Sequence, residues 1–68
     1  MKLEFSEKKL RDRVIFAYGV IPTKVDVKRH EVEVELKAKD VERLALDTEA
    51  VAEDLKTLVD REVHVTSV

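Results

Sequence analysis

The sequence predicts a small α+β fold in the order strand, helix, strand, strand, helix, strand, with a four-stranded antiparallel sheet and two helices on one face. Apolar and charged residues alternate in three segments, 1–5, 24–36 and 62–66, and this period of two is typical of half-buried strands. Between these segments apolar residues recur every three or four positions, which is typical of a helix with one buried face. A chain of 68 residues has room for one small core, so residues 1–68 are predicted to form a single domain.

The first strand and the first helix are predicted at the start of the chain. Apolar and charged side chains alternate over residues 1–5, as in a strand with one buried face. Ser6 can cap the helix that follows, in which Leu10 and Val14 lie one turn apart on the same face. Gly19 is the only glycine, and it stands where a left-handed residue is needed to end this helix.

A β-hairpin is predicted over residues 24–36, with its turn at Arg29 and His30. When Val27 is placed opposite Val32, every valine of the segment lies on one face of the hairpin. On the other face this register sets basic residues opposite acidic ones at two positions, which are favourable cross-strand pairs.

The second helix is predicted from an apolar stripe over residues 41–59. Leu46 lies off this stripe, and Asp47 can cap a shorter helix, so the alternative to one long helix is a break near Asp47. The last strand follows, because Val63 and Val65 alternate with polar residues.

This order of elements resembles the ferredoxin-like, or split βαβ, arrangement when its crossovers are right-handed. RNA-recognition motifs are similar in topology and stack bases on aromatic side chains of the two central strands. The corresponding positions here are charged, among them Glu31, Glu33 and Glu35, which argues against that use. The charged residues, 13 basic and 15 acidic, nearly cancel, so the basic excess of a nucleic-acid-binding domain is missing as well.

The hairpin also resembles that of heavy-metal-associated domains, through the valines of segments 25–27 and 32–34. Those domains carry a Cys-x-x-Cys motif just before the first helix, whereas this chain has no cysteine. A metal site is therefore not implied by the resemblance. Without cysteine, thiolate nucleophiles, Cys-ligated zinc and iron–sulfur clusters are excluded together, and no cofactor is predicted.

A third resemblance is to BON modules, small bacterial envelope domains associated with lipid or partner binding. It covers residues 6–65 and rests on the first helix, the 25–27 and 32–36 strands, and the helix before Val63 and Val65. BON modules place a glycine after the third-strand valines and another before the last strand. This chain has other residues at both places, Asp60 and Arg61 at the second of them.

The side chains do not predict catalysis. The two histidines, His30 and His64, should lie far apart in the predicted topology. His64 and Thr66 are neighbours on one strand face, which is more simply a solvated edge than a nucleophile with its base. We therefore expect a protein that is not an enzyme, with no catalytic residue, metal site or small-molecule substrate.

The stretch around the end of the first helix has more apolar residues than one helical stripe needs. We expect some of them to be exposed as a surface for a second copy or another protein, formed by Phe16, Tyr18, Val20 and Ile21. The alternative is that Tyr18 and Ile21 cover the end of the core.

The composition favours stability over any encoded ligand site. The chain is 41% charged and has no asparagine, no glutamine and one glycine, as in proteins of hyperthermophiles and in designed proteins. The first expectation is thus a thermostable, non-catalytic scaffold of designed or idealised sequence. Its alternatives are a hyperthermophile interaction or dimerisation module and a BON-like module. Without a signal peptide or a transmembrane segment, a cytoplasmic or recombinant soluble protein is expected.

Overall fold

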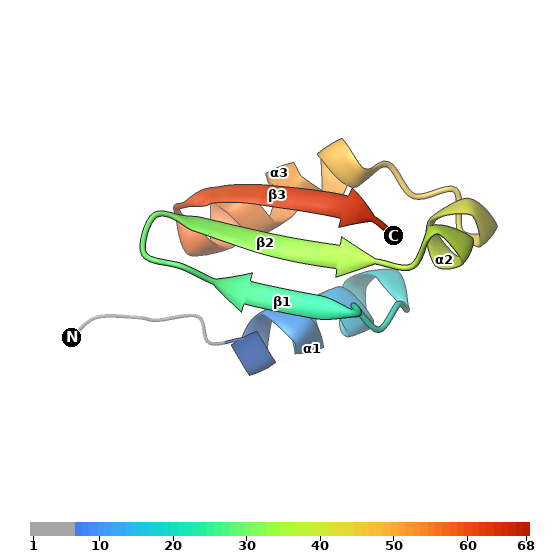
Figure 1. The fold of residues 1–68 in the computed structure, drawn as a ribbon, viewed down its shortest axis with the longest axis horizontal. Coiled ribbons are helices and arrows are strands. Elements are labelled where there is room, and N and C mark those ends of the chain that lie inside the picture. Colours follow the sequence, from blue (N-terminus) through green and yellow to red (C-terminus); the bar gives the residue numbers. More distant parts are fainter. Residues whose placement is uncertain (1–6) are drawn as a thin grey trace.

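The computed structural model describes residues 7–68, so the strand predicted over residues 1–5 lies outside the described residues. Figure 1 shows three strands side by side, with α1 and α3 on the same face of the sheet and α2 beyond its end. The elements in chain order are α1 (Glu7–Tyr18), β1 (Lys24–Val27), β2 (Glu31–Leu36), α2 (Ala38–Arg43), α3 (Thr48–Val59) and β3 (Glu62–Ser67).

The four-stranded antiparallel sheet is the main error of the sequence prediction. The described sheet has three strands in the order β1-β2-β3, in which β1 pairs antiparallel with β2 and β2 pairs parallel with β3. In a split βαβ fold the first strand of the chain would lie between the two strands that correspond to β2 and β3. Here β2 and β3 are hydrogen-bonded to each other directly. The helical crossover returns the chain to its starting end, which makes β3 a parallel neighbour of β2.

The hairpin has the predicted register. Val27 is opposite Val32 and Val25 is opposite Val34, so the valines share the face that the helices cover. The Lys28 N–H donates to the Glu31 carbonyl at 2.8 Å and closes the turn. Alternation of valine with charge fixes this register, because a slip by one residue would turn the valines out to solvent.

Gly19 ends α1 as predicted. Its φ is +72°, in the left-handed region, and its N–H donates to the Ile15 carbonyl at 2.8 Å. Within the helix Leu10 and Val14 are fully buried, as their spacing of one turn predicts.

The single long second helix is also wrong, and the chain breaks where the alternative placed it. Ala45 takes a left-handed φ of 51°, and the Asp47 side chain accepts the Glu49 N–H at 3.0 Å as the N-cap of α3. The reason is Leu46, which would point away from the core in a continuous helix. With the break, Leu46 packs against the core, and its N–H donates to the Val41 carbonyl at 2.9 Å.

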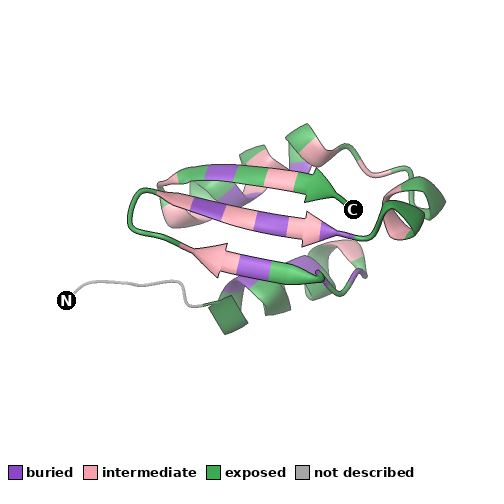
Figure 2. Cartoon of the chain, viewed as in Figure 1, coloured by how far each residue is buried: buried purple, intermediate pink, exposed green. Residues whose placement is uncertain are grey.

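The core lies between the sheet and the two longer helices, where Figure 2 shows the buried positions. Alternate residues of β2 are buried and its others half-buried, so one face of the central strand is sealed. All side chains of this core are aliphatic, and no polar side chain between residues 7 and 68 is buried. The core residues are Leu10, Val14, Val20, Val25, Val32, Val34, Leu36, Val51, Leu55 and Val63.

Candidate functional site

Two large apolar side chains project into solvent around the C-terminal end of α1. Phe16 is 90% exposed and Ile21, in the loop after the helix, is 68% exposed. A helix turns by about 100° per residue, so Phe16 points away from the side on which Val14 is buried. We call Phe16 and Ile21, with the less exposed Ile15 beside them in the sequence, the α1-end surface.

The four residues predicted as a partner surface divide into two groups. Phe16 and Ile21 are exposed, as such a surface requires. Val20 is only 2% exposed and belongs to the core, where it anchors the loop. Tyr18 is half-buried and packs against the core, so it covers the end of the core as the alternative proposed.

The α1-end surface lies on a basic helix. α1 has four basic residues and two acidic ones, and the helical repeat places Lys9 and Arg13 on the same side as Phe16. One of the acidic residues, Asp12, also shares that side and lies 3.8 Å from the Lys8 amino group. The excess of cations suits an anionic partner.

A cleft of about 440 Å³ opens beside the loop. Residues 19–23 form one wall, and Lys37, Asp40 and Arg43 around α2 line the other. Arg43 Nη2 lies 3.0 Å from Asp40 Oδ1, so these two residues of α2 form an ion pair. Ile21 thus lies beside a cleft whose other wall carries two basic residues and one acidic residue.

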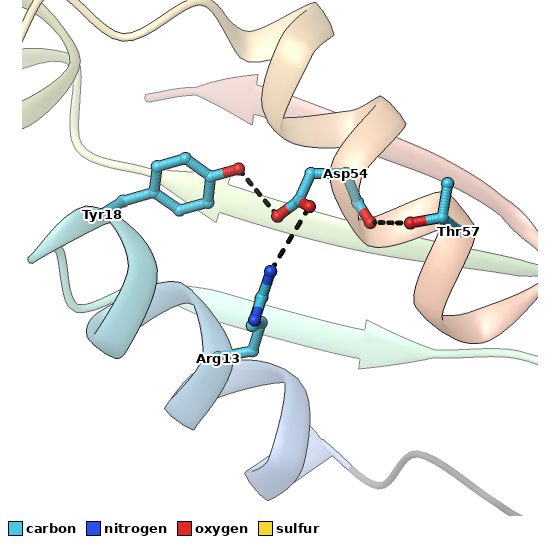
Figure 3. Close-up of polar contacts among 4 residues, drawn as sticks. All are labelled: Arg13, Tyr18, Asp54 and Thr57. Atoms are coloured by element: carbon cyan, nitrogen blue, oxygen red, sulfur yellow. Dashed lines mark hydrogen bonds and ion pairs between the residues drawn. The ribbon is translucent and has the colours of Figure 1, made fainter.

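A polar link that the sequence did not predict joins α1 to α3 (Figure 3). The Tyr18 hydroxyl donates to Asp54 Oδ2 at 2.9 Å, and Arg13 Nη2 donates to Asp54 Oδ1 at 3.4 Å. On α3 itself the Thr57 hydroxyl donates to the Asp54 carbonyl at 2.7 Å. The sequence does place Tyr18 one turn after Val14, on the core side of α1. Its partner Asp54 could not be predicted, because it is 36 residues away.

The pKa of Tyr18 is raised above its ordinary value of about 10. Partial burial is the largest cause, followed by the hydrogen bond to Asp54 and the charge of that carboxylate, while Arg13 opposes the shift. Because the pKa of Tyr18 is raised in the folded state, the stabilisation of the fold by the Tyr18–Asp54 link is complete at pH values below the pKa of tyrosine in the unfolded chain. It is lost as the pH rises through the folded pKa, when tyrosinate would face Asp54.

We expect the absorbance of tyrosinate to rise with a midpoint above that of the urea-unfolded chain. The measurement is unambiguous because the chain has one tyrosine and no tryptophan. Asp54→Ala should lower the midpoint, because it removes both the acceptor and the negative charge. Asp12→Ala, on the outer side of α1, should leave it unchanged, and equal midpoints for folded and unfolded protein would contradict the link.

The open face of the sheet has an acidic row along β2. Glu33 is opposite His64, and His64 Nε2 lies 3.7 Å from Glu31 Oε1. Lys28 Nζ lies 3.4 Å from Glu33 Oε2, and this carboxylate raises the pKa of the lysine. The face is therefore crossed by ion pairs between exposed groups, each of little energetic weight.

Histidine and hydroxyl side chains do not form a nucleophilic pair in the described chain. His64 and Thr66 line one shallow hollow with Glu33 and Glu35, but no hydrogen bond between residues 7 and 68 joins the threonine hydroxyl to the imidazole. The hairpin turn lies next to β3, because the Glu62 N–H donates to the His30 carbonyl at 3.4 Å. His64 itself lies two residues further along β3, opposite Glu33. Even so, residues 7–68 contain no group of three side chains suited to a metal ion.

Comparison with known proteins gave no relative, since no family profile, no curated protein and no solved structure matches the chain. Among the helices described within residues 7–68, none is long and apolar enough to cross a membrane. Over residues 7–68 the fold defines a small α+β protein with a three-stranded mixed sheet. Any function must be argued from its own surfaces.

Proposed function

We propose that the protein is a non-catalytic binding module that attaches to an anionic lipid surface through the α1-end surface. The observation that carries this proposal is Phe16, 90% exposed on a helix whose other face is already packed. Transfer of such a side chain out of water is worth about 1.5–3 kcal/mol, and Phe16 adds none of this to the core. A phenylalanine that projects in this way is suited to enter an apolar partner.

The charges around Phe16 favour an anionic partner over a second copy of the chain. A two-fold dimer through the α1-end surface would bring the basic residues of two α1 helices together, which is unfavourable. Anionic headgroups would instead lie beside the net positive charge of α1 while Phe16 enters the acyl boundary. Long basic side chains can reach headgroups from such a position.

The resemblance to BON modules supports the same partner. Its segments coincide with elements of the fold, with Leu10 and Val14 in α1, Val25 in β1 and Val63 in β3. Before the last strand, where BON modules have glycine, Asp60 takes a left-handed φ of 54°, a conformation that favours glycine. BON modules are associated with lipid or partner binding, and that association comes to this chain as part of the proposal.

The hydroxyl groups support a non-catalytic role. The Thr23 hydroxyl donates to the Glu35 carbonyl at 3.1 Å and the Thr57 hydroxyl to the Asp54 carbonyl at 2.7 Å. Both hydroxyls donate to backbone carbonyls, whereas a nucleophile needs a base as its partner.

Co-sedimentation with vesicles tests the proposal. The intact protein is expected to pellet with phosphatidylglycerol vesicles, to stay in solution with phosphatidylcholine vesicles, and to be released by salt. Phe16→Ser should weaken binding by about tenfold or more, since it removes most of the apolar contact. Val68→Ser is the matched control, because Val68 is also exposed, at 62%, and lies in the last residues of the chain.

The other outcomes are distinguishable. If no vesicle pellets the protein while light scattering shows a dimer that Phe16→Ser abolishes, the lipid proposal fails and the surface is a dimer interface. A protein that is monomeric at every concentration and binds no vesicle would overturn both the lipid proposal and the dimer interface. It would leave a stable scaffold. Equal loss of binding in Phe16→Ser and Val68→Ser would show that the α1-end surface is not the contact.

A further inference from the structure

Of the three helices described within residues 7–68, α2 is the one least attached to the core. Its six residues are all exposed or half-buried, and in this part of the chain the Lys37 side chain gives the helix no capping hydrogen bond. By contrast, α1 and α3 each bury two side chains in the core, and Asp47 caps α3. A helix this short is marginal in water unless packing supports it, so α2 depends on a few contacts with its surroundings.

Those contacts lie near the two ends of the segment 38–46, which consists of α2 and the turn that follows it. At the start the Ala38 N–H donates to the Val68 carbonyl at 2.7 Å. Further along, Val41 and Leu46 are half-buried and pack against the core. The Leu46 N–H donates to the Val41 carbonyl at 2.9 Å, so the turn closes back on the helix and the segment forms one unit.

The backbone changes direction at both ends of this unit. Lys37, directly after β2, is extended, with φ −68° and ψ 133°. Ala45 takes a left-handed φ of 51°, which is unfavourable for an L-residue and would be relieved if the turn opened. Rotation at these two places would move the unit while β2 and α3 stay where they are.

The same unit forms a wall of the cleft beside the loop after α1. Asp40 and Arg43 of α2, with Lys37 just before it, line this wall across from residues 19–23. Val20 lines the opposite wall and is only 2% exposed. The position of α2 therefore sets how wide and how deep this cleft of about 440 Å³ is.

We propose that residues 38–46 are a lid that opens as a unit while α1, α3 and the sheet stay folded, and that opening deepens the cleft as far as Val20. Opening breaks the bond between Ala38 and Val68 and lifts Val41 and Leu46 from the core, and the fully buried side chains stay in place. Local openings of this kind need less free energy than global unfolding. The lid is independent of the lipid proposal, which rests on α1.

Native-state hydrogen exchange of the whole protein, followed by NMR, tests the lid. The hydrogen-bonded amides of Val41, Leu44 and Leu46 should exchange at similar rates. These rates should be at least about tenfold faster than that of Leu55 in the middle of α3. Low concentrations of urea should speed exchange at Leu55 and hardly change the lid, because lid opening exposes little surface. Equal rates with equal urea dependence in the two segments would overturn the proposal.

Two truncations of half-buried side chains separate lid opening from global unfolding. Val41→Ala removes a contact of the lid and should speed exchange of the Leu46 amide several-fold. Leu58→Ala, near the far end of α3, should speed exchange at Leu55 and leave the Leu46 rate unchanged. Faster exchange of Leu46 in Leu58→Ala would show that α2 opens only when the whole protein unfolds, which contradicts the lid. Phe16→Ser should leave the Leu46 rate unchanged, so failure of the lipid proposal and failure of the lid are separable.

Thiol labelling tests whether opening reaches Val20. The chain has no cysteine, so Val20→Cys and Val14→Cys each carry a single thiol. Val20 lines the cleft, whereas Val14 is fully buried in α1. Under native conditions Val20→Cys should therefore react at least about tenfold faster than Val14→Cys, because opening of the lid is enough to expose it. Equal labelling rates for the two thiols would overturn the deepening of the cleft.

Discussion

Leu55→Ala is expected to leave much of the protein unfolded in water at room temperature. Leu55 is fully buried in α3 and belongs to the core against the sheet. Truncation of a buried leucine costs about 2–5 kcal/mol, because the contacts are lost and a cavity remains. A chain of 68 residues with one small core has only about 3–5 kcal/mol to lose. Urea unfolding followed by circular dichroism measures the difference.

Leu44→Ala is the matched control for this loss. Leu44 is 37% exposed at the end of α2, so the same truncation should lower the free energy of unfolding by less than about 1 kcal/mol. Similar urea midpoints for the two variants would contradict the placement of α3 against the sheet.

Ala45→Gly and Ala50→Gly are expected to change stability in opposite directions. Ala45 has a left-handed φ of 51°, which an L-residue adopts at a cost of about 1–2 kcal/mol and glycine adopts freely. Glycine there should raise the free energy of unfolding by about 1 kcal/mol. Ala50 lies within α3, where glycine should lower it by about 0.5–1 kcal/mol. Thermal unfolding by calorimetry of both variants beside the parent protein provides the measurement.

The opposite signs make this pair a direct test of the break between α2 and α3. If residues 41–59 formed one helix, both alanines would be helical and both substitutions would destabilise. A loss of stability in Ala45→Gly would therefore support one long helix over residues 41–59 and contradict the turn at Leu46.

Local pattern was sufficient for the hairpin and for the end of α1. The register of β1 with β2 follows from two runs of alternating valine and charge separated by a short turn. Gly19 could be predicted to end α1, because a lone glycine directly after a helical stripe typically adopts the left-handed conformation there. In both cases the residues that decide the structure are neighbours in the sequence.

The sheet could not be predicted in the same way. Val32 and Val63 are paired in the structure, but nothing in either segment specifies the other as its neighbour. An alternating segment at residues 1–5 suggested a fourth strand, and the familiar split βαβ order then placed it inside the sheet. The direct parallel pair of β2 with β3 is decided by tertiary packing, which a period of two does not encode.

The candidate surface was half predictable for a related reason. A surplus of apolar residues over one helical stripe correctly indicated that some would be exposed, as Phe16 and Ile21 are. Which of them would be buried depended on distant partners. Tyr18 is hydrogen-bonded to Asp54 on α3, and Val20 packs in the core. Neither contact can be inferred from the residues around the end of α1.

The parallel pair has a consequence for the order in which the chain folds. Val27 and Val32, paired in the hairpin, are five positions apart, whereas Val32 and Val63 are 31 apart. Closing the longer loop costs about 1.5 kcal/mol more in chain entropy, and two helices must form within it. The hairpin can therefore close first and offer β2 as a template. We therefore expect docking of β3, with α3 beneath it, to be the slow step that commits the chain to its native topology.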